Sequence, residues 1–307
     1  MTRVHKTIEG KPLAIEKEIA MTGRRVDTRL GVRAGAMALA VCLWLGGPAA
    51  AQAPLTLGLD GTFAPHAMPK LGGGIEGFNV DMANEIARRL GRPANVVAQE
   101  FSGLVPGLNA KRYDFLVAPM TVTAERAKSM LFTEGYLNTD YQFVIKKDAP
   151  DITKLEDLKG KTIAVNRGSI YDTWARDNLG KYGFQVENFN TTPDAIQAVQ
   201  SGRAFANLAG NTAAAWAVQK TPGLKLSYTI KTGLVWAIPF RKDDVAFRNQ
   251  VEEVVECMKL DGFYARLSEK WLGVKAEPGS PAVTVYPGYG TPGFEGYIAD
   301  KPAPKCK

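Results

Sequence analysis

Arg126 is the side chain in this sequence best suited to hold a small anion. It follows an apolar segment, residues 113–118, which is typical of a buried strand. A planar guanidinium can donate hydrogen bonds to both oxygens of a carboxylate. From position alone, a solvated charge on a short helix is the more common fate of such an arginine. Arg126 is therefore a candidate anion-binding residue whose role depends on the elements around it.

Three more polar side chains lie where strands end or helices begin. Ser169 follows Gly168 at an expected helix start, where free amides and the helix dipole attract anions. Thr121 can add a hydroxyl donor, and Asp60 ends the first expected strand, at the edge where open α/β sheets bind ligands. The simpler interpretations are helix caps for Ser169 and Thr121 and a turn residue for Asp60.

The sequence lacks the residues that metal sites and histidine-based catalysis require. His66 is the only histidine after residue 51, and the only cysteines there are Cys257 and Cys306. No CxxC spacing or second histidine is present to form a zinc site or a catalytic triad. We therefore expect no metal, no cofactor and no catalytic residue.

The first 51 residues have the features of an export signal. Four arginines precede the uncharged stretch 34–47, which leads to small residues and a cleavage site near Ala51. The rest of the chain carries 30 Lys/Arg against 27 Asp/Glu, with no basic stripe of the kind that binds nucleic acid. We expect a mature periplasmic protein that begins at Gln52, binds no nucleic acid and is a monomer.

Expected strands and helices alternate twice along the chain. One βαβαβ unit covers residues 55–118, and a second begins near residue 161 and continues through 208. This predicts an α/β fold of two lobes with parallel strands, joined by two crossing strands at 141–145 and 234–238. We expect lobe 1 to comprise residues 52–143 and 236–275, and lobe 2 to comprise residues 144–235. Residues 276–307 form a Pro- and Gly-rich tail.

Five motifs, in this order and spacing, resemble those of bacterial extracellular solute-binding proteins of family 3, the amino-acid class. They are Leu57-Gly58-Leu59-Asp60-Gly61-Thr62-Phe63-Ala64-Pro65, Gly77-Phe78-Asn79-Val80-Asp81, Met120-Thr121-Val122-Thr123-Ala124-Glu125-Arg126, Leu155-Glu156-Asp157-Leu158-Lys159-Gly160-Lys161 and Val165-Asn166-Arg167-Gly168-Ser169. The resemblance covers about residues 55–273. It implies a type II-like periplasmic-binding fold whose two lobes close around a ligand. The protein would bind a small carboxylate-bearing solute, an amino acid or a derivative, for the membrane permease of an ABC importer.

The resemblance also assigns roles to particular residues. The segment from Met120 and Thr121 to Arg126 would supply the carboxylate clamp. Phe63 and Phe101 would sandwich the ligand's side chain, although core packing is the common alternative for both rings.

Asn211 departs from the family pattern, which has an aspartate there to pair with the ligand's α-ammonium group. An asparagine can accept a hydrogen bond but adds no charge attraction. Either Asp60 compensates or the ligand lacks an α-amino group.

Two other functions remain open on the same fold. A periplasmic dehydratase of the cyclohexadienyl type would need an acid or base of tuned pKa in the cleft, and a sensor module would present its ligand to a membrane receptor. The two cysteines favour a Cys257–Cys306 disulfide in an oxidising compartment. The alternative is an inert Cys257 and a free Cys306.

Overall fold

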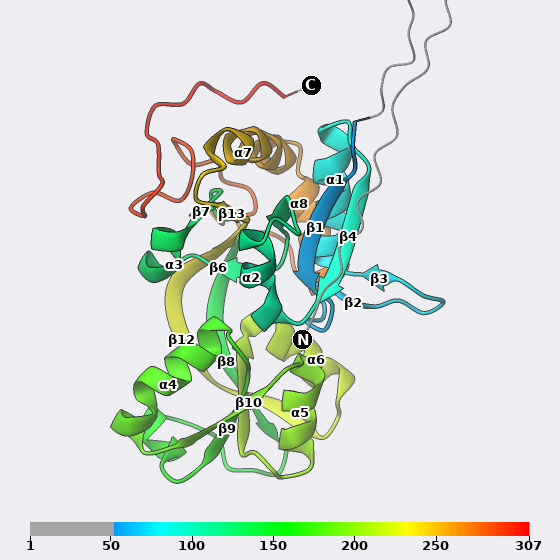
Figure 1. The fold of residues 1–307 in the computed structure, drawn as a ribbon. Coiled ribbons are helices and arrows are strands. Elements are labelled where there is room, and N and C mark those ends of the chain that lie inside the picture. The colour runs from blue at the N-terminus through cyan, green and yellow to red at the C-terminus, as the bar shows by residue number, and fades with distance from the viewer. Residues whose placement is uncertain (1–51, 307) are drawn as a thin grey trace, which may run out of the picture. The chain divides into compact units, whose positions relative to one another are not determined.

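Two separate main β-sheets organise the computed structural model, which describes residues 52–306. The expected signal and the cleavage site near Ala51 lie outside these residues. The sheets occupy the upper and lower parts of the view in Figure 1. None of the helices in the described part of the chain is both long enough and apolar enough to cross a membrane.

The first sheet has three parallel strands in the order β4-β1-β5. These are β1 (Leu55–Asp60), β4 (Ala94–Gln99) and β5 (Phe115–Leu116). Three leucines of β1 are fully buried. Helix α1 (Phe78–Arg89) covers this sheet with an apolar face, as its helical spacing predicts. A turn η1 (Phe101–Gly103) and helix α2 (Leu104–Asn109) follow β4, and a hairpin of β2 (Met68–Pro69) and β3 (Ile75–Glu76) precedes α1.

The second sheet has six strands in the order β10-β9-β11-β8-β12-β6. They are β6 (Met120–Thr121), β8 (Leu137–Lys146), β9 (Thr162–Asn166), β10 (Gln185–Phe189), β11 (Ala206–Gly210) and β12 (Leu224–Ala237). The helical elements of this part are η2 (Leu155–Leu158), α4 (Ile170–Tyr182), α5 (Thr192–Gln200) and α6 (Asn211–Lys220). Strands β9, β10 and β11 run parallel, as the repeated βα pattern predicts.

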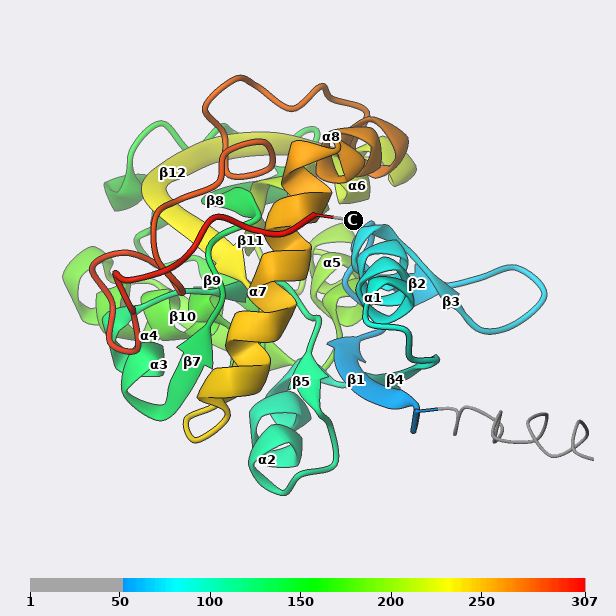
Figure 2. The same cartoon turned by 90° about the horizontal axis from the view of Figure 1, so that it is seen from above.

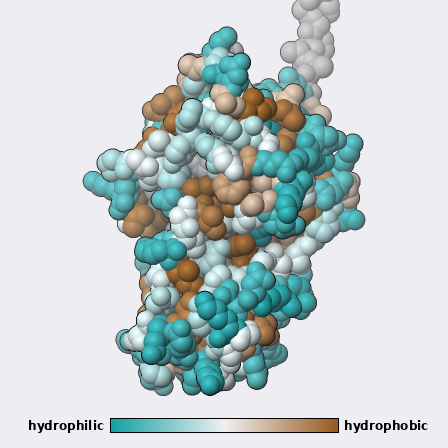
Figure 3. Space-filling model, turned by 90° about the vertical axis from the view of Figure 1, so that its left-hand side faces the viewer, coloured by the Kyte–Doolittle hydropathy of each residue, from teal (hydrophilic) through white to brown (hydrophobic). Residues whose placement is uncertain are grey.

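The long strands β8 and β12 run side by side and antiparallel, and Figure 1 shows both passing from the lower part toward the upper part. The segments expected to cross between lobes, 141–145 and 234–238, lie within or at the end of these strands. Between β6 and β8 the chain forms α3 (Ala124–Ser129) and β7 (Met130–Phe132), and β7 pairs with β13 (Pro239–Arg241). On the face in Figure 3, small hydrophobic patches are scattered from the upper to the lower part among hydrophilic surface.

The chain returns to the upper part through α7 (Val245–Leu260), α8 (Phe263–Leu267) and a helical turn η3 (Ser268–Leu272). The tail then folds back over α7, where Figure 2 shows it as a red segment crossing the gold helix. A disulfide joins Cys257 of α7 to Cys306, which confirms the pairing expected from the cysteine count.

Candidate functional site

A small cavity lies between the carboxyl end of β1, the segment from β6 to α3, and the amino end of α4. Its volume is about 20 Å³, which is room for about one water molecule. The lining residues are Asp60, Phe63, Phe101, Pro119, Thr121, Arg126, Asn166, Ser169, Ile170 and Tyr171. Six of the eight residues expected to bind ligand are therefore brought together, and Met120 and Asn211 are not.

Arg126 is held in the cavity wall by its own helix and by the strand before it. Its backbone N–H donates to the Thr123 hydroxyl, which caps α3 at 3.2 Å, and its Nη1 donates to the Thr121 carbonyl at 3.1 Å. Among residues 52–306 no carboxylate lies within ion-pair distance of this guanidinium. Burial lowers the pKa of Arg126, and the nearby phenols of Tyr141 and Tyr171 only partly oppose this. The site therefore presents a half-buried cation without an ion-pair partner in the described part of the chain.

Asp60 lies opposite in the cavity wall and is 2% exposed. Its Oδ1 accepts hydrogen bonds from the Thr62 backbone at 2.9 Å and from the Thr62 hydroxyl at 2.7 Å. Its Oδ2 lies 3.4 Å from the Asn166 amide nitrogen. Burial raises the pKa of Asp60 despite these hydrogen bonds. Asp60 is thus a well-held acceptor and the only carboxylate that lines this cavity among the described residues.

Ser169 and Thr121 line the cavity but already have structural partners. The Ser169 hydroxyl caps α4 by accepting from the Asp172 backbone at 3.2 Å, as the helix-cap interpretation predicts. The carboxylate of Asp172 in turn accepts from the Gly168 N–H at 2.9 Å, so this amide is not free for an anion. The Thr121 hydroxyl accepts from the Trp236 indole at 3.1 Å and keeps its own proton to donate.

Phe63 and Phe101 contribute the aromatic surface of the cavity. Phe63 is 8% exposed and stacks on His66 with ring centroids 5.5 Å apart, whereas Phe101 is only partly buried. Met120 is fully buried because β6 pairs with Ala237 there, and its side chain belongs to the hydrophobic core.

Asn211 lies at the first position of α6 and lines a different hollow. That hollow has a volume of about 520 Å³ and is bordered by Trp216 of the same helix and by Trp271 of η3. The Asn211 side-chain oxygen lies 3.5 Å from the Asp140 backbone nitrogen. The position at which the family pattern has an aspartate therefore does not line the Arg126 cavity in this arrangement.

Four residues of the cavity were absent from the sequence-based candidates, and two of them, Asn166 and Tyr171, carry polar groups. Asn166 ends β9 at the carboxyl edge of its sheet, which is the signal that could have identified it. Its buried Oδ1 has no hydrogen-bond partner among the described residues, so it can accept from a ligand. Tyr171 lies in the first turn of α4, two residues after Ser169, and its ring contacts Tyr141 edge-on at 5.3 Å.

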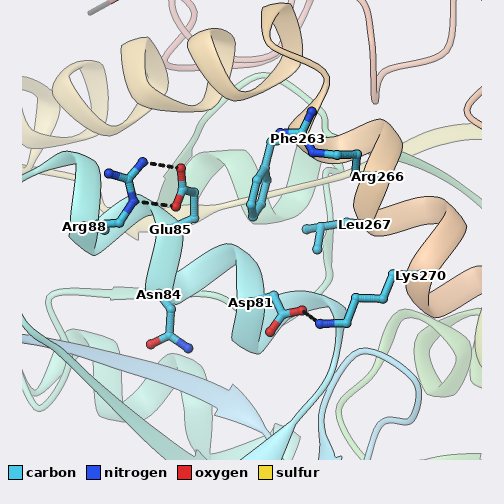
Figure 4. Close-up of a pocket in the computed structure, with 8 residues that line it drawn as sticks. All are labelled: Asp81, Asn84, Glu85, Arg88, Phe263, Arg266, Leu267 and Lys270. Atoms are coloured by element: carbon cyan, nitrogen blue, oxygen red, sulfur yellow. Dashed lines mark hydrogen bonds and ion pairs between the residues drawn. The ribbon is translucent and has the colours of Figure 1, made fainter.

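A larger hollow between α1 and α8, of about 380 Å³, differs from this cavity in its electrostatics. Figure 4 shows two ion pairs in it, Arg88 with Glu85 and Lys270 with Asp81, and Arg266 pairs with Asp261 outside the hollow. The Lys270–Asp81 distance is 2.7 Å. A hollow whose charges are already paired and exposed gives little attraction for an ionic ligand.

Three buried carboxylates, Glu134, Glu252 and Glu256, approach one another within 4.8 Å beneath the tail. Each also faces a cation, so the group forms an ion-pair network. Its pairs are Glu134 with Lys259 at 2.6 Å, Glu252 with Arg248 at 3.8 Å, and Glu256 with Lys301.

Residues 55–274 match the model of the family described as bacterial extracellular solute-binding proteins, family 3. The chain belongs to this family. It is 30% identical over 231 residues to the L-arginine-binding protein of Pseudomonas aeruginosa, a match that covers 73% of this chain and 89% of the relative. It is also 30% identical over 221 residues to the L-cystine-binding protein TcyJ of Escherichia coli, covering 71% and 82%. The tail follows the matched range.

Solved structures confirm the expected two-lobed α/β fold. An ancestral arginine-binding protein bound to arginine superposes with a TM-score of 0.69 at 32% identity, over 72% of this chain and 98% of that one. The ancestral amino acid-binding protein AncCDT-1, a precursor of cyclohexadienyl dehydratase, gives a TM-score of 0.67 at 29% identity, over 71% and 95%.

Proposed function

We propose that this protein is the periplasmic substrate-binding component of an ABC importer and captures a small carboxylate-bearing solute, an amino acid or a derivative of one. The observation that carries the proposal is the half-buried guanidinium of Arg126, which lines the cavity and has no ion-pair partner among the described residues. A ligand carboxylate would supply that charge and form charge-assisted hydrogen bonds. The L-arginine- and L-cystine-binding relatives support a ligand of this size and class.

The α-ammonium group of an amino acid would be held by Asp60 and Asn166 in place of the missing aspartate. Both line the Arg126 cavity, and the Asn166 Oδ1 has no partner in the described part of the chain. A carboxylate and an amide oxygen provide the acceptors that an ammonium group needs. We expect a ligand without an amino group to bind more weakly.

Ligand entry requires the two lobes to separate, because about 20 Å³ is too small for any amino acid. We propose that residues 52–143 and 236–275 form one lobe and residues 144–235 the other, with residues 276–307 as a tail on the first. The cavity is lined from both, so closure around the solute would complete the site. The expected partner is the membrane permease, and the expected form is a monomer delivered by its signal peptide.

The test is calorimetry with L-arginine, L-cystine, L-histidine and L-glutamine, guided by native mass spectrometry of any solute that co-purifies. Arg126→Ala should weaken binding at least about 100-fold, because a buried charge loses its partner. Arg88→Ala, a surface arginine of the α1–α8 hollow, is the matched control and should bind as wild type. Binding by Arg126→Ala within threefold of wild type would refute the carboxylate assignment.

Binding without conversion distinguishes this proposal from a dehydratase. AncCDT-1 gives that alternative structural support, but the obvious general base, His66, is fully buried and has both ring nitrogens engaged. We expect no aromatic product when the protein is incubated with prephenate or arogenate, and its appearance would establish the enzyme instead.

A further inference from the structure

His66 joins parts of the chain that belong to different proposed lobes. It lies in the loop after β1, is fully buried, and packs against Phe63, Phe78 and the edge of Trp236. Its Nδ1 lies 2.9 Å from the Asn79 side-chain oxygen on α1. Its Nε2 lies 2.8 Å from the Thr212 hydroxyl on α6, which is 146 residues away in the sequence.

The hydrogen-bond network determines which ring nitrogen carries the proton. The Asn79 amide nitrogen donates to the Val117 carbonyl at 2.6 Å and contacts the Tyr136 hydroxyl at 2.8 Å. The Asn79 oxygen therefore faces the imidazole and accepts from its Nδ1–H. This leaves Nε2 as an acceptor for the hydroxyl proton of Thr212, so the ring is neutral in this arrangement.

We propose that the His66–Thr212 hydrogen bond is an acid-sensitive latch that holds the two lobes closed and strengthens ligand capture at neutral pH. The inference rests on the proposed function, which assigns residues 66 and 212 to lobes that move apart. His66 does not line the Arg126 cavity. It acts as a positioning residue through Phe63, which stacks on it and does line the cavity.

Among the described residues, the groups in contact with His66 carry no negative charge to balance a second proton on its ring. The groups that face it are the aromatic rings of Phe63, Phe78 and Trp236 and the uncharged side chains of Asn79 and Thr212. Asn79 also connects His66 to a titratable group, the phenol of Tyr136, whose pKa is raised by burial. Burial lowers the pKa of His66 from 6.5 to about 4, and the bond to Asn79 opposes this only in part.

The sign of the pH effect follows from linkage. Opening the lobes exposes Nε2 to water and returns the pKa of His66 toward 6.5, so the open form binds the proton more tightly. The latch stabilises the closed form fully above about pH 6.5, and this stabilisation decreases as the pH falls toward 4. At pH 5 the ratio of closed to open forms decreases by up to about 30-fold relative to pH 7.5.

Nitrogen NMR of protein labelled with ¹⁵N-histidine tests the latch without any ligand. The sequence has only two histidines, so comparison with His66→Gln assigns the His66 signals. We expect the Nδ1–H tautomer and a pKa below 6. Thr212→Val should shift the Nε2 resonance, and Thr212→Ser should restore it. An Nε2–H tautomer, or an Nε2 signal that is unchanged in Thr212→Val, would overturn the latch.

Solution scattering from pH 7.5 to 4.5 then tests the consequence for lobe closure. The wild-type radius of gyration should increase as the pH falls, whereas His66→Gln, which cannot gain the charge, should show a smaller change with pH. Identical profiles for the two proteins would refute the pH dependence. These readouts use no solute, so a failure of the amino-acid assignment would appear in calorimetry and leave them unaffected.

Discussion

Replacing Cys306 by Ser removes the covalent link between the end of the tail and α7, and we expect a large loss of stability with little change of structure. The two cysteines are 49 residues apart in sequence, and their Cα atoms lie 5.4 Å apart. The tail has further anchors on α7. The Gly290 N–H donates to Glu252 at 2.7 Å, and Arg248 donates to the Gly296 carbonyl at 3.0 Å. These bonds should keep the tail in place in the folded variant.

The magnitude follows from the entropy of the unfolded chain. Closing a loop of this length restricts the unfolded state by about 4 kcal/mol in the chain-entropy model, and the variant regains that freedom. For a domain of this size, 4 kcal/mol corresponds to a decrease in Tm of roughly 8 to 15 °C.

Urea unfolding followed by circular dichroism measures this loss of stability. Wild type in dithiothreitol should match Cys306→Ser without it, and a Cys257→Ala/Cys306→Ser double variant controls for the free thiol. A loss below about 1 kcal/mol would refute the entropic reasoning. Two free thiols after residue 51 in denatured, unreduced wild type would refute the bridge itself.

Two further predictions concern the backbone at α1 and the charges beneath the tail. Gly77→Ala should destabilise the protein by about 3 kcal/mol or more in urea unfolding, because φ is +144° and a Cβ would lie 2.4 Å from the His66 carbonyl oxygen. Gly74→Ala, with φ of +79° and open space, should lose only about 1 to 2 kcal/mol. Burial raises the pKa of Glu252 to about 8 from 4.5, so its contribution to stability is complete below pH 4.5 and is lost as the pH rises through 8. In wild type this decline in stability should be on the order of 2 to 4 kcal/mol. Glu252→Gln should show a smaller change of stability with pH, and a pH profile identical to that of wild type would contradict the prediction.

The repeated strand–helix pattern of the sequence was sufficient to predict the fold. Buried strands such as β1 and β9 consist of apolar and small residues, and α1 alternates apolar and polar residues at helical spacing. These signals are local, so they can be read along the chain. The position of Arg126 after the end of a strand could be predicted in the same way, because parallel strands end at a common edge of the sheet.

The face of α7 that the tail covers could not be predicted from the sequence. Arg248, Glu252, Glu256 and Lys259 recur at helical spacing, a pattern typical of a solvent-exposed face, yet all four are buried. The tail covers them, and Lys301 returns to pair with Glu256. The orientation of Asn211 could not be predicted either, because it depends on how α6 packs against η3 and not on local spacing.

Arg126 is half-buried and differs from the buried cations Lys259 and Arg248 in a way that explains why we expect the site to select an anion. Lys259 lies 2.6 Å from Glu134, and the Arg248 guanidinium, 3.8 Å from Glu252, also donates to backbone carbonyls. Among the described residues, the Arg126 guanidinium donates to one backbone carbonyl and lies near the phenols of Tyr141 and Tyr171. A solvated arginine would gain at most about 1 kcal/mol from pairing, because water already satisfies it. A desolvated one gains much more, because the ligand's carboxylate replaces hydration that the fold has removed. We therefore expect the partial burial of this guanidinium, together with its lack of an ion-pair partner among the described residues, to strengthen the binding of a carboxylate.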